Sequence, residues 1–290
     1  MPRADSGPVL VTGATGTVGR AVVAALLTAG QEVRAGVRDP GAADLPPGTE
    51  AVRLDFDDPS TAGPAVAGVN RVFLMRPPAI SDVRTSLGPL VDAARRASVQ
   101  RVVVLSVMGV NPALPHWRME RMVRTAGLPM TALRPSYFSQ NLISAFGADI
   151  RDRSQLRLAS RNGRLSFVDT RDVAAVASAV LTDPDAHAAR PLTLTGPEAL
   201  TFGDVAALLT AELGRSVSYV PEGLLRRRRD LLAQGTDPAY VRVQLVIDVT
   251  TRLGLARKVT GEIARVLGRP ATTLAEFVHD HHTVWTPTAR

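Results

Sequence analysis

The chain has 290 residues, 45% of them hydrophobic and 21% charged, which is ordinary for a globular protein with one large α/β domain or with a domain and a smaller lobe. It has no cysteine, which excludes disulfides, thiolate nucleophiles and zinc–thiolate sites. The net charge of +7 would suit an anionic ligand or nucleic acid, but a general preference for arginine explains it more simply, and no nucleic-acid partner is expected.

No apolar signal-peptide core is present in Met1–Pro8. No stretch approaches the roughly 18 apolar residues that are needed to cross a bilayer. We therefore expect a cytoplasmic protein that does not enter the membrane.

The first half of the chain alternates short apolar runs with helical patterns. Strands are predicted at Val9–Thr12, Val33–Val37, Ala51–Leu54, Arg71–Met75, Arg101–Ser106 and Met130–Leu133. Helices are predicted at Arg20–Ala29, which Gly30 ends, and at Leu87–Ala97. Continuously apolar strands are typical of a parallel sheet covered on both faces, so the pattern predicts an α/β fold with a doubly wound Rossmann-type sheet.

After about Phe138 the pattern is less regular. Further elements are predicted at Asp172–Leu181, Pro191–Thr195, Thr201–Gly214, Ser216–Val220 and Ala271–His282, and Thr201 caps the third of these. We predict one α/β unit over 1–290. Residues 1–140 form mainly the dinucleotide-binding core, and about 141–290 form mainly a small C-terminal α/β substrate lobe with elements that return to the core. The basic run Arg226–Arg229 is interpreted as the solvated face of a helix.

A glycine-rich loop, Gly13–Gly19, connects the first predicted strand to the first helix. Glycines at these spacings allow a tight turn, close approach of the backbone to a pyrophosphate, and close packing of helix and strand. The helix N-terminus attracts phosphate, and Thr15 and Thr17 can add hydroxyl donors. The predicted contacts of a bound dinucleotide in this loop are Gly13, Thr15, Gly16, Thr17 and Val18.

The ends of the following strands indicate which dinucleotide binds. Arg38 follows the second strand, where an arginine can pair with the 2′-phosphate of NADPH, although the neighbouring Asp39 could compete for that position. Asp55 follows the third strand and can accept from the adenine amino group, while Phe56 can flank the ring. Asp58 is expected to start the next helix. Later strand ends add the predicted cofactor contacts Met75, Arg76, Ser106, Tyr137 and Phe138.

The loop Thr12–Gly19, the Val-Arg-Asp-Pro at 37–40 and Asp55 resemble the atypical short-chain dehydrogenase/reductases, specifically the NmrA-like group. Further similar segments are Met119–Gln140 with Asn141, which contains Arg-Pro-x-x-Phe-x-x-Asn, together with Ser166–Val173 and Leu274–Phe277. The resemblance implies an NAD(P)H-binding Rossmann domain with a small C-terminal lobe. The group includes quinone reductases, azoreductase-like enzymes, tailoring reductases and non-catalytic nucleotide-sensing regulators.

The Tyr-x-x-x-Lys pair of the ordinary short-chain reductases is absent, because no tyrosine is followed by lysine four residues later. His116 and Glu120 lie one helical turn apart near where the resemblance would place that pair, and His116 and Tyr137 are the candidate catalytic residues. A quinone-like acceptor needs less help from an enzyme acid, because hydride addition gives a delocalised anion.

The sequence therefore predicts an NADPH-dependent oxidoreductase that delivers hydride to a quinone-like or conjugated carbonyl compound, with an aromatic small molecule as substrate. The alternatives are a non-catalytic NADP-sensing regulator and a tailoring reductase or epimerase of secondary metabolism. His279, His281 and His282 are interpreted as the solvated end of the last helix, so no metal site is expected. Association into a homo-oligomer is left open.

Overall fold

The computed structural model describes residues 7–183, 186–187 and 189–286. The expectation about a signal peptide rests on Met1–Pro8, of which residues 1–6 lie outside the described residues.

The chain divides into two compact units. The first comprises the chain up to Pro135 together with Thr170–Leu194 and Glu262–Arg269. The second comprises Ser136–Asp169, Thr195–Gly261 and the chain from Pro270 onward. One α/β unit, with a core over residues 1–140 and a smaller lobe over about 141–290, is expected from the sequence, and this organisation stays a prediction.

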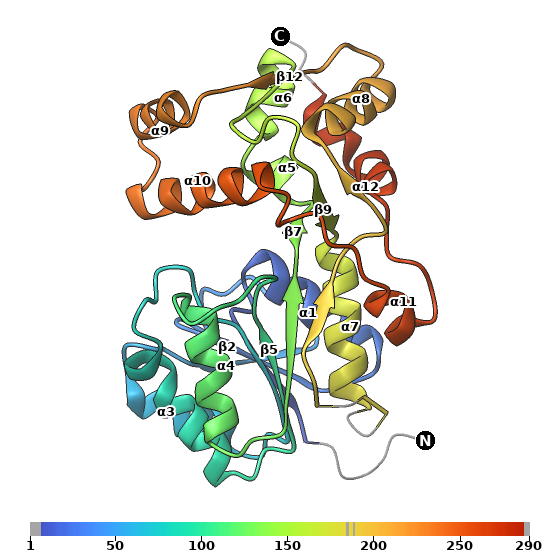
Figure 1. Ribbon diagram of the computed structural model, residues 1–290. Helices are drawn as coiled ribbons and strands as arrows, with labels where there is room; N and C mark the ends of the chain where they lie inside the picture. The colour runs from blue at the N-terminus through green and yellow to red at the C-terminus, as the bar shows by residue number, and fades with distance from the viewer. Residues whose placement is uncertain (1–6, 184–185, 188, 287–290) are drawn as a thin grey trace. The chain divides into compact units, whose positions relative to one another are not determined.

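The first unit is built on a seven-stranded sheet with the order β10-β6-β5-β4-β1-β2-β3, in which every neighbouring pair is parallel (Figure 1). The strands are β1 (Val9–Thr12), β2 (Val33–Val37), β3 (Thr49–Arg53), β4 (Arg71–Leu74), β5 (Arg101–Leu105), β6 (Met130–Pro135) and β10 (Leu192–Leu194). Val9 of β1 pairs with Val33 on one side and with Arg71 on the other, so the strand order reverses at β1. The predicted Rossmann-type sheet is confirmed, and such a reversal is where ligands bind in open α/β sheets.

Helices cover both faces of this sheet, as Figure 1 shows, with α1 packed against α7 and α3 packed against α4. The helices are α1 (Thr17–Thr28), α2 (Ala62–Val66) after the short 3₁₀ turn η1 (Pro59–Thr61), α3 (Val83–Arg96), α4 (Pro115–Thr125), α7 (Thr170–Thr182) and α11 (Glu262–Leu267). One face of the strands, represented by Leu10 and Val104, forms a common buried core with Leu87 of α3 and Met119 of α4. Burial on both faces explains why β1, β4 and β5 are rich in apolar residues, whereas the edge strand β3 is partly exposed and carries Glu50 and Arg53.

The second unit holds a three-stranded sheet, β11-β9-β7, and a two-stranded sheet, β12-β8. The strands are β7 (Tyr137–Phe138), β8 (Gln155–Leu158), β9 (Leu165–Val168), β11 (Ala199–Leu200) and β12 (Ser218–Pro221). The helices are α5 (Asn141–Ser144), α6 (Gly147–Arg153), α8 (Phe202–Leu213), α9 (Leu224–Ala233), α10 (Pro238–Arg252) and α12 (Leu274–His281), followed by the 3₁₀ turn η2 (His282–Trp285). Its core contains Phe146, Phe202, Phe277 and Trp285, each almost fully buried.

Local signals in the second unit account for its helix ends. Thr201 and Asp204 form the reciprocal hydrogen bonds of a capping box, and Gly214 ends α8 at a φ of 62°, as predicted. The last helix starts at Leu274 rather than at 271, because Thr273 and Glu276 form a second capping box there. The interpretation of the whole arginine run as solvated is wrong at Arg227, which is only 8% exposed.

Over the ranges that the structure describes, no helix combines the length and the apolar character that a membrane span requires.

Candidate nucleotide-binding site

The loop between β1 and α1 contains two glycines that the packing of the chain itself requires. Gly13 has a φ of +64°, and a Cβ there would lie 2.2 Å from Cε of Met75. A Cβ on Gly19 would lie 2.0 Å from the carbonyl oxygen of Gly13, so any side chain would push the helix away from the turn. These two positions therefore hold the loop against its own helix and against the end of β4.

Gly16 differs from these two, because its own chain leaves room for a methyl group. Its φ is −82°, and a Cβ there would meet the Gly13 carbonyl oxygen at 3.4 Å and Met75 Cε at 3.7 Å, which are ordinary contacts. Gly16 is also the N-cap of α1, which has neither a side-chain cap nor an acidic residue in its first turn. The first-turn N–H groups therefore lack a capping side chain and are suited to a phosphate.

The side chains around this helix start have the predicted character. Thr15 and Thr17 are exposed, so their hydroxyl groups are accessible, whereas Val18 is buried in the helix packing. This combination of an open Gly16, an uncapped helix and two exposed hydroxyls fits the pyrophosphate of a dinucleotide. The individual contacts stay predictions.

Arg38 and Asp39 at the end of β2 have different surroundings. Arg38 is exposed and, among the described residues, forms no hydrogen bond or ion pair. The Asp39 carboxylate instead accepts from the backbone N–H groups of Gly41 at 3.0 Å and Ala42 at 3.3 Å. Oδ1 of Asp39 is thus engaged in its own turn, whereas its Oδ2 and the guanidinium of Arg38 have no hydrogen-bond partner among the described residues. A free guanidinium fits a 2′-phosphate.

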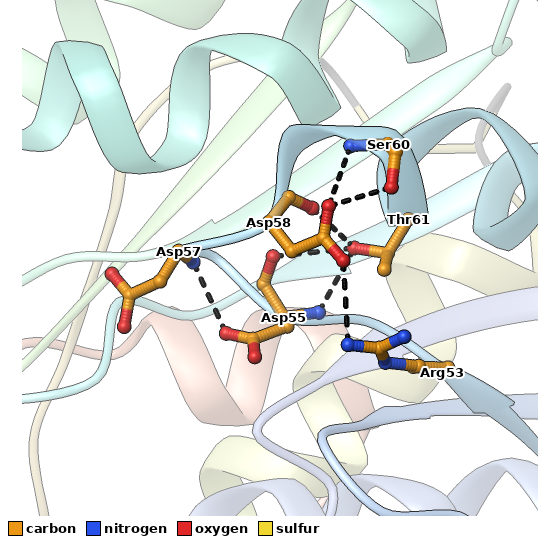
Figure 2. Close-up of polar contacts among 6 residues, drawn as sticks. All are labelled: Arg53, Asp55, Asp57, Asp58, Ser60 and Thr61. Carbon is orange, nitrogen blue, oxygen red and sulfur yellow. Dashed lines mark hydrogen bonds and ion pairs between the residues drawn. The ribbon is translucent and has the colours of Figure 1, made fainter.

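Figure 2 shows the acidic turn that follows β3. Asp58 caps the 3₁₀ turn η1 by accepting from the N–H of Ser60 at 3.2 Å and from its hydroxyl at 2.6 Å, and Arg53 pairs with it at 3.3 Å. The hydrogen bonds from Ser60, followed by the charge of Arg53, hold the pKa of Asp58 below its usual value, while its slight burial opposes them. The predicted start of the next helical element at Asp58 is confirmed.

Asp55 is held by the same turn in a different way. Its backbone N–H donates to Thr61 Oγ1 at 3.0 Å, and its Oδ1 accepts from the N–H of Asp57 at 3.1 Å (Figure 2). Its Oδ2 accepts no hydrogen bond from the residues that the structure describes, so it remains available for an adenine amino group. Phe56 is half-buried and packs against the sheet core. The roles of Asp55 and Phe56 toward adenine stay predictions.

The ends of β1 and β4 are tied together beside the glycine loop. The hydroxyl of Thr12 donates to the carbonyl of Met75 at 3.1 Å and accepts from its N–H at 2.7 Å. Arg76, the next residue, uses Nη1 to donate to the carbonyls of Pro77, Pro78 and Ile80, and its burial lowers the pKa of the guanidinium. Arg76 therefore braces its own loop, and a contact with the nucleotide would have to come from its remaining nitrogens.

His116 lies in the first turn of α4, and its Nδ1 is buried without a hydrogen-bond partner in the described part of the chain. Burial, followed by the positive charge of Arg76, lowers the pKa of His116 to about 4, although Glu120 opposes this shift. The imidazole is therefore neutral at pH 7 and cannot supply a proton as an imidazolium. Only its neutral N–H is left for the catalytic role that was predicted.

Tyr137 and Phe138 form β7 of the second unit. The ring of Tyr137 is 9% exposed and meets the Phe167 ring edge-on, with centroids 5.6 Å apart. Burial, followed by the charges of Tyr240 and Asp248, raises the pKa of Tyr137 above its ordinary value, so the phenol keeps its proton at neutral pH. Its hydroxyl is thus a hydrogen-bond donor, as the prediction of a catalytic hydroxyl requires. Phe138 is half-buried.

The model of the NmrA-like family matches residues 5–241 of this chain. The chain belongs to the NmrA-like family. The uncharacterized oxidoreductase YesF of Bacillus subtilis is 31% identical over 281 residues, which cover 96% of each chain. An NAD(P)H azoreductase of Xenophilus azovorans is 32% identical over 281 residues, which cover 94% of this chain and 97% of the relative.

A solved structure has the same fold as this NmrA-like chain. It is an NADPH-dependent quinone oxidoreductase from Escherichia coli in complex with NADPH, with a TM-score of 0.82 and 24% identity. The match covers 94% of this chain and 99% of that chain.

Sequence reasoning missed one pair in this NmrA-like protein, that of Arg134 with Glu120. Arg134, the arginine of the Arg-Pro-x-x-Phe-x-x-Asn segment, donates from Nε and Nη2 to the two carboxylate oxygens of Glu120 at 2.9 and 2.6 Å. Glu120 is 2% exposed, and burial alone would raise its pKa, but Arg134, the hydroxyl of Ser106 and the charge of Arg124 lower the pKa of Glu120 below its ordinary value. Glu120 is thus held by Arg134 rather than by His116.

Ser106 at the end of β5 is buried, and its Oγ lies close enough to Glu120 to affect that carboxyl group without forming a well-aligned hydrogen bond to any described residue. The predicted contact of Ser106 with the cofactor stays a prediction.

The three C-terminal histidines have local partners. His279 bonds to Glu212 at 2.8 Å, His281 to the carbonyl of Phe277 at 2.9 Å, and His282 to the carbonyl of His279 at 2.8 Å. Within the described ranges, no three histidine or carboxylate side chains converge in a way that could hold a metal ion.

Proposed function

We propose that this NmrA-like protein binds NADPH at the carboxyl ends of its seven-stranded sheet and reduces a quinone-like or conjugated carbonyl compound. The observation that carries the proposal is the space at Gly16, a glycine that the chain's own packing does not require. A glycine at an uncapped helix start is what a closely approaching pyrophosphate needs. The oxidoreductase names of relatives that align over nearly the whole chain support a redox function.

The preference for NADPH over NADH rests on Arg38. Its guanidinium is not engaged by any described residue, and the carboxylate of Asp39 is fixed in its own turn because Oδ1 accepts from the N–H groups of Gly41 and Ala42. A guanidinium pairs with the 2′-phosphate through charge-assisted hydrogen bonds. The NADPH named for the E. coli quinone oxidoreductase with the same fold agrees with this choice.

The acceptor class follows from the acid groups that the chain can offer. When bound, NADPH would supply a hydride. The chain has neither a Tyr-x-x-x-Lys pair nor a protonated His116, and the phenol of Tyr137 has a raised pKa, which makes it a hydrogen-bond donor but a weak acid. Such donors suffice for an acceptor whose reduced form is a delocalised anion, and they fall short for a simple ketone.

A test of the proposal is the steady-state oxidation of NADPH and of NADH with a panel of acceptors. The panel should contain a naphthoquinone, an azo dye, an enone and an unactivated ketone. We expect NADPH-dependent turnover of the quinone, with the ketone slower by orders of magnitude. Tight NADPH binding without turnover of any acceptor would contradict the enzymatic proposal and favour the nucleotide-sensing regulator.

A further inference from the structure

The arginine run on α9 contains one residue that differs from its neighbours. Arg226, Arg228 and Arg229 are exposed, whereas Arg227 is only 8% exposed. Arg226 and Arg229 both pair with Asp230, at 3.5 and 3.3 Å. A basic run is usually a solvated surface, so a single buried member needs a separate explanation.

Arg227 has an aromatic neighbour but no ionic partner. Its Cζ lies 5.8 Å from the centre of the Phe146 ring. Its Nε is fully buried and, in the portion of the chain that the structure describes, has no hydrogen-bond partner. The same portion contains no ion pair of Arg227. Because a buried cation without a counterion is unfavourable, this position calls for a negatively charged partner.

One candidate partner of Arg227 is Asp248 of α10, which is 3% exposed and whose charge interacts with that of Arg227. Its Oδ1 already accepts from the Ser160 hydroxyl at 2.5 Å and from the N–H of Ala159 at 3.1 Å. The charges of Arg227 and Asp248 interact, and yet the two side chains are not within ion-pair distance. Asp248 is therefore held by other groups and does not neutralise Arg227 by contact.

The ring of Phe146 lies beside Arg227, and the phenol of Tyr137 is close enough to interact with its charge. The protonated phenol of Tyr137 is near enough for the charge of Arg227 to lower its pKa in part, against the larger effect of burial. The ring of Phe146 meets that of Phe202 edge-on, Phe202 meets Phe167 in the same way, and Phe167 meets Tyr137. A guanidinium and a phenol both donate hydrogen bonds, and a negatively charged oxygen accepts from both.

We infer that Arg227 is an anion-binding residue of the second unit, which takes the carboxylate, sulfonate or phosphate group of an aromatic or conjugated small molecule. That this molecule is the substrate rests on the proposed function, whereas the anion site itself does not. The charged group selects among acceptors, and Arg227 takes no part in the transfer of electrons.

The experiment uses 2-naphthalenesulfonate, which cannot be reduced under these conditions, and its neutral analogue 2-naphthalenesulfonamide. Binding of each is measured by calorimetry to the full-length protein, with and without saturating NADP⁺. The variants are Arg227→Gln and, as the matched control, Arg228→Gln, which removes the same charge from an exposed position on the same helix. We expect Arg227→Gln to weaken sulfonate binding about ten- to a hundredfold and Arg228→Gln to change it less than about twofold. The sulfonamide should bind all three proteins equally.

Three results would overturn the inference. They are equal sulfonate affinity in wild type and Arg227→Gln, an equal loss in both variants, and an equal loss of sulfonate and sulfonamide in Arg227→Gln. If Arg227→Gln does not fold, wild type alone decides, because an unaltered protein that binds the sulfonamide as tightly as the sulfonate has no anion site. A protein that binds the sulfonate through Arg227 but oxidises no NADPH would retain the anion site and contradict only the proposed reduction.

Discussion

Arg134 on β6 forms a two-point ion pair with Glu120 on α4, in which both donor–acceptor distances are 2.9 Å or shorter. The pair connects α4, the helix that carries His116, to the carboxyl end of β6. The arginine of the Arg-Pro-x-x-Phe-x-x-Asn segment is thereby engaged with Glu120 inside the first unit.

Removing one side of this pair should destabilise the fold. Glu120→Ala leaves Arg134 without its partner, and because the Arg134 side chain is 26% exposed, we expect a loss of about 3 kcal/mol, the lower end for a broken buried pair. Asp44→Ala, which breaks the exposed pair with Arg20, is the control and should cost about 1 kcal/mol or less. Urea unfolding measures both variants. Equal losses would mean that burial of Glu120 adds nothing to the pair.

The glycine loop should separate folding from nucleotide binding. Gly16→Ala places its methyl group in ordinary contact with the chain, so the melting temperature should change little, while NADPH affinity falls at least about tenfold. Gly13→Ala forces a side chain into a left-handed turn against Met75, and we expect a loss of stability of about 1–3 kcal/mol. Calorimetry and thermal unfolding measure the two effects. Unchanged NADPH affinity in Gly16→Ala would remove the pyrophosphate from this loop.

Arg38 should determine the choice between the two nucleotides. Arg38→Ala removes a charge-assisted hydrogen bond to the 2′-phosphate, so NADPH binding should weaken by about 1.5–3 kcal/mol more than NADH binding. Arg53→Ala removes another exposed arginine, the one paired with Asp58, and should leave the ratio of the two affinities unchanged. Isothermal titration with both nucleotides gives the ratio. A parallel decrease for both nucleotides in Arg38→Ala would show that its side chain does not reach the phosphate.

His116 should make the protein less stable in acid. An unfolded histidine titrates near pH 6.5, whereas the pKa of His116 in the folded chain is about 4, so between these values the unfolded state binds a proton that the folded state does not. Stability is therefore lost as the pH falls through this window. Wild type should lose about 2 kcal/mol more than His116→Asn between pH 7 and pH 4.5. Urea unfolding at both pH values tests this, with exposed His282→Asn as the control that should behave as wild type. Identical losses in wild type and His116→Asn would contradict the burial of a neutral ring.

The predictable part of this fold is the part with strong local signals. β1 and β2 match their predicted ranges residue for residue, because both are apolar runs bounded by turn residues and buried on both faces. α8 and its ends follow from Thr201, Asp204 and Gly214, which act within the helix itself. Where a local interaction decides the structure, the sequence is enough.

The remainder depends on contacts between distant segments. Arg227 is buried because it packs against Phe146, which lies far away in the sequence. In the sequence it belongs to a run of four arginines, and such a run predicts an exposed helix face. The role of Glu120 follows from Arg134, and its spacing from His116 was a misleading local signal. The helix α10 was missed although Asp237 caps it and Pro238 occupies its first turn, a combination that marks a helix start.

Reduction of a quinone-like acceptor by NADPH bound in the glycine loop can be measured in a single turnover. The preformed complex of protein and NADPH is mixed with 1,4-naphthoquinone in an anaerobic stopped-flow instrument, and the absorbance of NADPH is followed. We expect a fast decay that saturates with quinone concentration and slows less than about a hundredfold in Tyr137→Phe. With NADPH near the wild-type Kd, the amplitude of this decay should fall in Gly16→Ala in proportion to the loss of NADPH binding. A stable NADPH complex whose absorbance does not decay, or a decay that is unaffected by Gly16→Ala, would contradict the proposed reduction.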